Sequence, residues 1–413
     1  MMTPMRTVSE HQAIVLANTD VLGQVDVPLL DALGQCLASD IVAPWPLPSF
    51  DNSSMDGYAV ISADVADASE ANPRALRVIA DAAAGSSGHL EVVSGTAVRI
   101  MTGAPIPSGA DAVVPIEATN GGIADVLVRE AVTSGSYVRW AGEDVTAGSV
   151  VMRAGTVVTE RSLAVLASVG RASVPVFRRP RVVVISTGDE LVEPGTVLSH
   201  GRIIDSNGVM LTACAREAGA VAHRAPLVRD QEDEVRAALD LAAADADIIV
   251  TSGGVSMGAY DTMKAVLSRT GEVEFARVAM HPGMPQGTGL VRFSGGRHVR
   301  IVTLPGNPVS SFISFELFVR PLIRAMMGFT EGSRPGERAR SDEAFDSPVA
   351  KQQYVRAVLS RASDGSRRVR PVGGQGSHVV GGLAQADCLV VVPVGVGRVE
   401  VGSEVEVIDL TRR

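Results

Sequence analysis

Apolar runs and helix-like patterns alternate along residues 180–328. The runs RVVVIS, VAHRAPLV, IIVTS and VRIVTLP are short, rich in β-branched residues and bounded by turn residues, which predicts strands. Between and after them, apolar positions recur at helical spacing in segments that begin near Asn207 and Gly258, in one around Val235, and in a long one that ends near Met327. This alternation predicts a doubly wound α/β domain with an open parallel sheet.

The flanking segments carry other patterns. A Ser9-x-x-Gln12 capping box before apolar residues predicts a first helix over 9–19, and Thr159 with Gly170 bounds a second. Short β-like runs separated by Gly, Pro and Ser predict two small β domains. The expected multidomain α/β and β protein has a discontinuous helical domain (1–45 plus 146–179), a small β domain (46–145), the α/β domain (180–328) and a C-terminal β-barrel-like domain (329–413), the last opened by a linker at 331–340.

Composition narrows the class of protein. With 413 residues and 46% hydrophobic content, the chain has ample sequence for several cores. A net charge of −9 argues against nucleic acid or an anionic membrane as partner. The three cysteines are far apart and lack CxxC spacing, which suggests buried free thiols in a reducing cytoplasm. No apolar run approaches the ~20 residues of a spanning helix, so we expect a cytoplasmic protein without a membrane segment.

The stretch IIVTSGGVSMGAYD at 248–261 carries the first chemical signal. Two glycines at the end of a strand allow close approach to a ligand, and the N–H groups of the loop then point at an anion such as phosphate. Asp261 beside a phosphate requires a bridging divalent cation. The alternative is that the glycines and serines serve turn geometry alone. Ala259 and Tyr260 stand where a Walker A loop requires Lys and Ser/Thr, and no convincing GxGxxG is present.

Three more polar loops strengthen the phosphate interpretation. STGDE at 186–190, DSNG at 205–208 and LPGNPVS at 304–310 also follow apolar runs. In an open parallel sheet such loops meet at one edge. Together with the glycine loop they predict a metal-assisted phosphate site.

The motifs together resemble a known family. FDNSSMDGYAV (50–60), RIMTGAPIPSGADAVVP (99–115), STGDEL (186–191), TSGGVSMGAYD (251–261), LPGNPVS (304–310) and GQGSH (374–378) are similar to the MoeA-type molybdopterin molybdenumtransferases, which also include the gephyrin E domain. The resemblance covers nearly the whole chain in order. It implies an enzyme of molybdenum cofactor biosynthesis that inserts molybdate into adenylylated molybdopterin with Mg²⁺-dependent release of AMP. It also implies an elongated homodimer with the active site at the subunit interface.

Carboxylates at the predicted strand ends are candidates for the catalytic and cation-binding groups. Glu190 and Asp261 match the family motifs without substitution, and the resemblance implies that they are the metal ligands. Asp205 and Asp230 join them as candidates, but an Asx turn ahead of an Asn207 cap and a helix N-cap, respectively, are equally open. The substrate-binding candidates in these loops are Asp205, Asn207, Ser252, Gly253, Gly254, Ser256, Pro305, Gly306, Asn307 and Pro308, and Pro308 also suits the first position of a helix.

Other candidates lie outside the α/β domain. By resemblance, Asp56 and Thr102 approach the active site from the partner subunit, with Asp144 assisting, although MDGY and TGAP alone predict turns. Arg356 and Ser377 match family positions associated with oxyanion binding, where a guanidinium fork suits molybdate. The alternative for Arg356 is an exposed arginine on a strand.

The segment AMHPGMPQG departs from the family. His281 stands where relatives commonly have a lysine, and Met284 also replaces a usual family residue. An imidazole with a pKa near ~6.5 is mostly neutral at pH ~7.5, which predicts weaker or more pH-dependent molybdate binding. The alternative is that His281 is a polar rim residue and that Arg356 and Ser377 hold the anion.

Three other functions remain open from the sequence. A molybdopterin adenylyltransferase shares the α/β domain, but the extra β domains argue against it. A non-catalytic scaffold related to the gephyrin E domain is disfavoured by the retained Asp56, Glu190 and Asp261. A paralogue that inserts tungsten, or that serves one molybdoenzyme, has no distinguishing residue. Other cofactor-biosynthesis proteins and molybdoenzymes are the expected partners.

Overall fold

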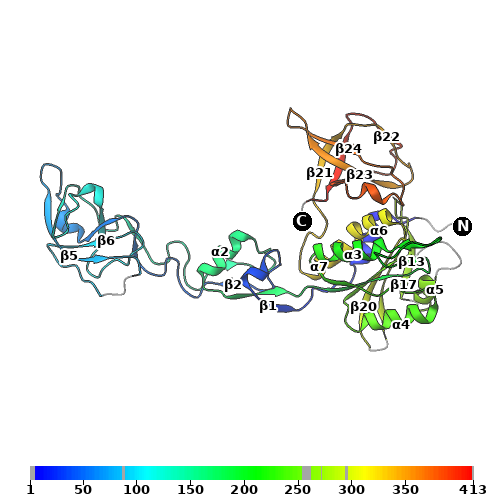
Figure 1. Cartoon of the computed structure of the whole chain (residues 1–413). Coiled ribbons are helices and arrows are strands. Elements are labelled where there is room, and N and C mark those ends of the chain that lie inside the picture. The colour runs from blue at the N-terminus through cyan, green and yellow to red at the C-terminus, as the bar shows by residue number, and fades with distance from the viewer. Residues whose placement is uncertain (1–4, 86–88, 254–261, 271, 294–295, 412–413) are drawn as a thin grey trace. The chain divides into compact units, whose positions relative to one another are not determined.

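A computed structural model describes residues 5–85, 89–253, 262–270, 272–293 and 296–411 (Figure 1). By its internal contacts the chain divides into two compact units. Unit 1 comprises Met1–Val25 and Pro175–Arg413, and unit 2 comprises Asp26–Val174. Unit 2 is therefore an insertion in unit 1. The chain runs between them through β1 (Gln24–Pro28) and β11 (Ser173–Phe177), which pair with each other.

A mixed six-stranded sheet forms the centre of unit 1, in the order β15-β12-β16-β20-β19-β17. The first four strands are parallel, and the pairings of β20 with β19 and of β19 with β17 are antiparallel. Their bounds are β12 (Arg181–Ser186), β15 (Val221–Arg224), β16 (Ile248–Ser252), β17 (Val273–Arg277), β19 (Pro285–Arg292) and β20 (His298–Leu304). The four predicted strands and the doubly wound α/β class are confirmed, and the two antiparallel pairings extend the parallel sheet at one edge.

Helices cover both faces of this sheet, as Figure 1 shows. One face carries α1 (Val8–Leu16), α3 (Ser206–Glu217) and a long helix that runs through α6 (Pro308–Ser314), the π-helical turn Phe315–Val319 and α7 (Arg320–Met326). The other face carries α4 (Glu232–Ala243) and α5 (Thr262–Ser268). Val182 and Val184 enter the first core, while Val183 and Ile185 enter the second. This alternation explains the continuous apolar run of β12.

Three helix starts differ from the predictions. The capping box of α1 is formed by Thr7 and Glu10, not by Ser9 and Gln12. Asp205 caps α3, while Asn207 lies in its first turn. The N-cap of α4 is Gln231, so the N-cap interpretation of Asp230 is wrong. At the start of each helix, several neighbouring polar residues could have formed the cap. The conformation of the preceding backbone decides which of them does so.

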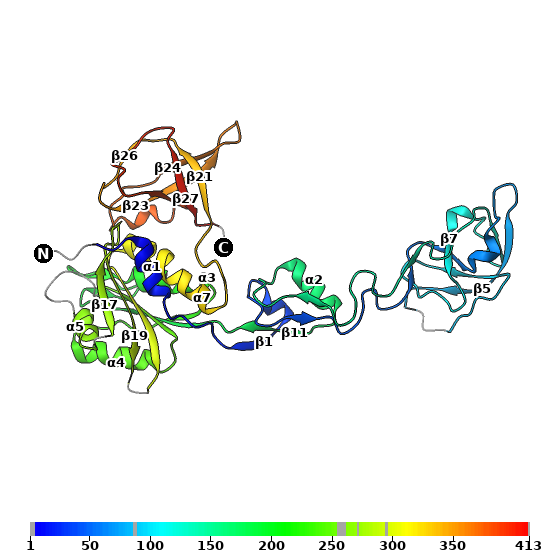
Figure 2. The ribbon, with the colours of Figure 1, turned by 180° about the vertical axis from the view of Figure 1, so that it is seen from behind.

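Helix α1 buries a histidine against the long helix (Figure 2). His11 is fully buried, and its ring meets Phe318 edge-on with centroids 4.8 Å apart. Neither ring nitrogen has a hydrogen-bond partner in the part of the chain that the structure describes. Burial, with a smaller contribution from Arg6, lowers the pKa of His11 to about 4. The folded protein therefore resists protonation of this imidazole more than the unfolded chain does.

His11→Phe is expected to reduce acid sensitivity. The unfolded chain takes up the proton near pH ~6.5, so the wild type should lose about 2–3 kcal/mol of its free energy of unfolding through this group as the pH falls to 4.5. This loss of stability is absent above pH ~6.5 and increases as the pH falls to about 4. Urea unfolding at pH 7 and 4.5 measures it, and equal pH dependences for the two proteins would contradict it.

Unit 2 contains a five-stranded sheet in the order β7-β4-β6-β5-β8, within the segment where short β-like runs predicted strands. Helix α2 (Glu160–Ser168) begins after the N-cap Thr159 and ends before Gly170, as predicted. Gly170 has φ +75°, and a Cβ there would meet the Trp45 ring at 2.1 Å. The strands of this unit are β2 (Ile41–Val42), β3 (Asn52–Ser53), β4 (Gly57–Val60), β5 (Arg74–Ala82), β6 (Thr96–Ile100), β7 (Ala112–Pro115), β8 (Asp125–Val128), β9 (Val138–Arg139) and β10 (Val150–Met152).

A second sheet of unit 1 has the order β18-β23-β24-β21-β27-β25. A further pairing of β23 with β25 closes five of its strands into a ring, as expected for a barrel-like fold. Its strands are β18 (Met280–His281), β21 (Gly336–Ser341), β23 (Gln352–Arg361), β24 (Arg367–Pro371), β25 (Cys388–Val392) and β27 (Glu404–Asp409), with β22 (Phe345–Asp346) and β26 (Arg398–Val399) as a separate pair. Strand β21 begins within the predicted linker 331–340. The prediction of a linker is therefore wrong over 336–340. In the described segments no helix has the length and apolarity needed to span a bilayer.

Candidate functional site

Three of the predicted loops begin side by side. Ser186, Ser252 and Leu304 are register partners at the carboxyl ends of β12, β16 and β20. Gly253, directly after Ser252, and Gly306, two residues after Leu304, approach so closely that a Cβ on Gly306 would lie 3.7 Å from the Gly253 Cα. Parallel strands thus deliver these loops to one edge of the sheet.

Asn207 joins the fourth loop to two of the others. Its Nδ2 donates to the Ser252 Oγ at 2.8 Å and to the Gly306 carbonyl at 2.6 Å. The Asn207 Oδ1 is buried and has no hydrogen-bond partner among the described residues. The side chain thereby fixes the loops while leaving one acceptor available to a ligand.

Asp205 is fully engaged within the protein. Its Oδ1 accepts hydrogen bonds from the Ser186 Oγ at 3.0 Å and the Gly208 N–H at 2.8 Å. Its Oδ2 accepts from the Arg224 Nη1 at 2.9 Å, and the side chain is 1% exposed. This geometry gives Asp205 the role of helix cap and ion-pair partner, and leaves little capacity for a metal.

Glu190 presents a different environment. It is exposed, and its side chain makes no hydrogen bond to the described residues. Gly188 has φ +157°, and a Cβ there would lie 2.6 Å from the Glu190 Oε2. The carboxylate therefore rests against the Gly188 backbone, and both of its oxygens are available among the described residues.

The remaining acidic candidates are less well defined. The Asp230 N–H donates to the Asp189 Oδ1 at 3.3 Å, and its carbonyl accepts from the Thr262 Oγ1 at 3.0 Å. Gly254, Ser256 and Asp261 lie outside the described residues. Among the residues that are described, no group of three or more His, Cys, Asp or Glu is arranged to hold a metal.

The LPGNP loop is joined to the C-terminal sheet domain. The Asn307 Nδ2 donates to the Ser377 Oγ at 2.8 Å, and the Val309 N–H donates to the Ser377 carbonyl at 3.1 Å. Pro308 is the first residue of α6, and the Pro305 carbonyl accepts from the Ser311 Oγ. The prediction that Pro308 is the first residue of a helix is confirmed, and substrate binding by this loop stays a prediction.

Arg356 is a buried residue of β23, so the alternative of an exposed strand arginine is wrong. Its Nη1 donates to the Val379 carbonyl, and its Nη2 donates to the carbonyls of Gly374 and Gly376. Burial lowers the pKa of Arg356. The guanidinium therefore shapes the loop that carries Ser377. The GQGSH glycines were the only sequence signal for such a loop.

His281 is half-buried in β18, in register with Gln353. Burial lowers the pKa of His281, and the nearby positive charge of Lys351 lowers it further. Lys351 immediately precedes β23, whose Gln352 N–H donates to the Ala279 carbonyl at 2.9 Å. Sequence reasoning missed this cation, because its proximity to His281 arises from strand pairing across 70 residues.

The predicted residues of unit 2 form their own small group. The Asp56 Oδ1 accepts hydrogen bonds from the Thr102 N–H at 2.7 Å and from its Oγ1 at 2.8 Å. The backbone hydrogen bond, followed by that of the hydroxyl, lowers the pKa of Asp56. Asp144 is exposed and bonds through its backbone N–H to the Leu47 carbonyl. Asp56 is thus an exposed, ionised carboxylate of fixed orientation.

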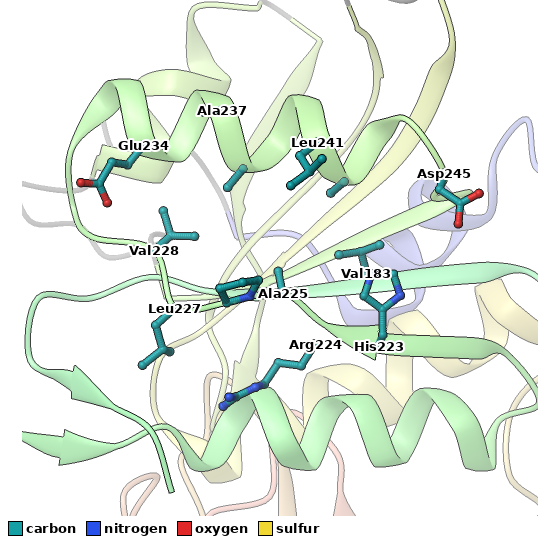
Figure 3. A pocket seen from close by; sticks show the side chains of 13 residues that line it. Val183, His223, Arg224, Ala225, Leu227, Val228, Glu234, Ala237, Leu241 and Asp245 are labelled. Carbon is teal, nitrogen blue, oxygen red and sulfur yellow. The ribbon is translucent and has the colours of Figure 1, made fainter. Parts of the chain in front are cut away.

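Within unit 1, a pocket of about 380 Å³ opens between β15 and α4 (Figure 3). Its walls are mainly apolar and include Val183, Leu227 and Leu241. None of the predicted site residues lines it. The substrate site is better described by the converging loops than by this groove.

Comparisons with known proteins agree with the motifs. Three family models match in order: the MoeA N-terminal region (domain I and II) at 6–170, a probable molybdopterin binding domain at 183–325, and the MoeA C-terminal region (domain IV) at 338–410. Molybdopterin molybdenumtransferase 2 of Mycobacterium tuberculosis is 45% identical, with 98% of this chain and 100% of that protein covered. Molybdopterin molybdenumtransferase of Bacillus subtilis is 37% identical, with 92% and 89% covered. The crystal structure of the molybdopterin biosynthesis MoeA protein from Pyrococcus horikosii is 31% identical, with a TM-score of 0.85 and 98% and 99% covered. The resemblance is confirmed, and the chain belongs to the MoeA family.

Proposed function

We propose that this protein inserts molybdate into adenylylated molybdopterin and releases AMP in a Mg²⁺-dependent reaction. The observation that carries the proposal is the junction of three loops at Asn207, with the available carboxylate of Glu190 in the loop that follows β12. Relatives that match over their full length are named molybdenumtransferases, which supports transferase activity over an adenylyltransferase or a scaffold. The buried Cys388 thiol, which forms no disulfide, supports a cytoplasmic location.

The residues fit the proposed cation. Mg²⁺ is commonly held by one or two carboxylates together with substrate phosphate oxygens. Glu190, given room by Gly188, would supply one carboxylate, and Asp261 would supply the other. The bound ion would stabilise negative charge on the phosphates as the adenylate is cleaved. The unpaired Asn207 Oδ1 is suited to accept a hydrogen bond from a pterin N–H group.

A direct assay tests this function. Purified protein is incubated with adenylylated molybdopterin, MgCl₂ and either molybdate or tungstate, and AMP and the finished cofactor are quantified. We expect both products with molybdate. Absence of AMP with either oxyanion, from a protein shown to be folded, would overturn the proposal. The two oxyanions compared at equal concentration also give the metal preference.

We further propose a homodimer in which Asp56 and Thr102 of one subunit serve the site of the other. Their orientation supports this, since the exposed Asp56 carboxylate is held by Thr102 and faces no cation within hydrogen-bonding distance among the described residues. Asp56→Asn and Glu190→Gln should each inactivate the homodimer. Their mixture should regain about a quarter of wild-type activity, because half of randomly assorted dimers are mixed and each has one intact site. No recovery after subunit exchange confirmed by native mass spectrometry would contradict the shared site.

Molybdate affinity should depend on pH through His281. The protonated imidazole binds an anion, and this interaction is lost as the pH rises through the folded-state pKa. Because burial and Lys351 lower that pKa, we expect the loss below pH ~6.5, earlier than the unperturbed value predicts. His281→Lys should bind more tightly at pH 7.5 with a flat profile. Calorimetric titration with molybdate between pH 5 and 8 measures this, with His223→Lys on β15 as the control.

Identical affinities and pH profiles for wild type and His281→Lys would remove His281 from the oxyanion site. Arg356 and Ser377 would then be the better candidates. The Nη groups of Arg356 already bond to backbone carbonyls, so this arrangement would require the loop at 374–379 to change its hydrogen bonds on binding.

A further inference from the structure

Arg224 links two parts of the candidate site that lie apart in the sequence. It is the last residue of β15, and its guanidinium is turned away from α4 towards α3 (Figure 3). Its Nη1 donates to the Asp205 Oδ2 at 2.9 Å, and its Nη2 forms an ion pair with the Glu193 carboxylate. One guanidinium therefore holds two carboxylates from different segments.

The two carboxylates belong to elements with distinct roles. Asp205 caps α3, whose Asn207 joins the loops after β16 and β20. Glu193 directly follows β13 (Leu191–Val192), three residues after Glu190. The ion pairs thus connect the segment that carries Glu190 to the helix that organises the other loops.

The segment around Glu190 has few other anchors. Strand β13 pairs with β14 (Ile203–Ile204) over two residues only, and the loop between them exposes Val197 by 93%. Backbone hydrogen bonds run from Ile203 to Glu190 and from Asp205 to Val192 across the strand pair, and turn bonds run from Leu191 to Gly188, from Thr196 to Glu193 and from Arg202 to Ser199. The Arg202 Nη1 also donates to the Asp189 carbonyl. We call the ion pair between Arg224 and Glu193 the tether. Because this segment has so little apolar packing, the tether contributes a large share of its local order.

We propose that Arg224, acting through Glu193, is a positioning residue for the Glu190 carboxylate. The inference rests on the proposed function, in which Glu190 binds the cation. The fork of an arginine spans two carboxylates, whereas the ammonium of a lysine is a single point charge and would stay with the buried Asp205. Loss of a group that orients a metal ligand typically lowers metal affinity or activity by about 10–100-fold.

Glu193→Gln tests the tether without disturbing the buried ion pair. We expect the MgCl₂ concentration for half-maximal AMP release to rise about tenfold, with kcat at saturating MgCl₂ close to wild type. Arg224→Lys should behave in the same way, because it keeps a charge beside Asp205. The matched control is Asp245→Asn, which breaks an exposed pair with Arg181 at the other edge of the sheet and should leave the Mg²⁺ requirement unchanged. An unchanged Mg²⁺ requirement in Glu193→Gln would overturn the proposal.

A second measurement does not depend on activity. Amide hydrogen exchange should accelerate several-fold across 191–204 in Glu193→Gln, and remain at wild-type rates there in Asp245→Asn. If the wild type released no AMP, the proposed function would fail, while the exchange experiment would still decide whether the tether orders this segment. Wild-type exchange rates at 191–204 in Glu193→Gln would show that it does not.

Discussion

Replacing Glu190 with glutamine is expected to lower AMP release on the order of 100-fold or more. The carboxylate is exposed, makes no hydrogen bond to the described residues and rests against Gly188. An amide would therefore remove charge with little loss of packing, and the free energy of unfolding should change by less than about 0.5 kcal/mol. Steady-state AMP release at saturating MgCl₂, together with urea unfolding, measures both quantities.

Two further variants make this result specific. Asp233→Asn removes another exposed carboxylate of the same domain, in the first turn of α4, and should leave turnover unchanged. Gly188→Ala keeps Glu190 but places a methyl group where its carboxylate lies, so it should also reduce turnover. Near wild-type AMP release by Glu190→Gln would exclude Glu190 from the mechanism.

The largest effect on stability is expected from Glu316→Gln, at about 3–5 kcal/mol. The Glu316 Oε2 accepts from the Arg334 Nε at 2.6 Å and from the Arg320 Nε at 2.9 Å, and Glu316 and Arg320 are each 3% exposed at the side chain. Burial raises the pKa of Glu316 even beside Arg334. Neutralising this carboxylate leaves two buried guanidinium groups with Glu217 as their remaining anionic partner in the network.

An exposed ion pair provides the control. Arg338 and Glu404 approach to 3.1 Å, but their side chains are 71% and 59% exposed. Because water screens such a pair, Glu404→Gln should change the free energy of unfolding by at most about 1 kcal/mol. Chemical denaturation at pH 7 measures the change in the free energy of unfolding in Glu316→Gln and in Glu404→Gln. Equal changes in the two variants would contradict the larger cost that we expect for the buried network.

Much of the architecture was predictable because strand signals in this chain are strong. β12, β16 and β20 are nearly uninterrupted runs of Val and Ile, so their existence and the position of the loops after them followed directly. β19 was missed because Gly287 and Gly289 dilute its pattern. Gly287 is required there, since a Cβ would lie 2.2 Å from the Thr303 Oγ1. Close packing between neighbouring strands thus requires glycine at a position where a strand pattern would have an apolar side chain.

The residues of the candidate site also fall into those that the sequence predicts and those that it does not. Residues at strand ends, such as Glu190, Ser252 and Gly306, could be named from the sequence because the fold class determines where strand ends meet. The buried state of Arg356 could not, since its carbonyl partners at 374–379 exist only once that loop has folded. Arg224 and Lys351 were missed for a similar reason, as both act on residues brought near by pairing over long sequence separations.

The insertion of unit 2 into unit 1 has a consequence for synthesis on the ribosome. Helix α1 emerges first, yet the helical segment 315–326 against which it packs emerges only after unit 2 and most of the α/β domain. At ordinary elongation rates Val8 and Val15 wait roughly 15–60 s for their partners. Unit 2 has its complete sequence before then and can fold during the interval. The exposed apolar face of α1 is therefore a natural binding site for a chaperone on the nascent chain, and weakening its capping box should lower the yield of folded protein more than the stability of the finished molecule.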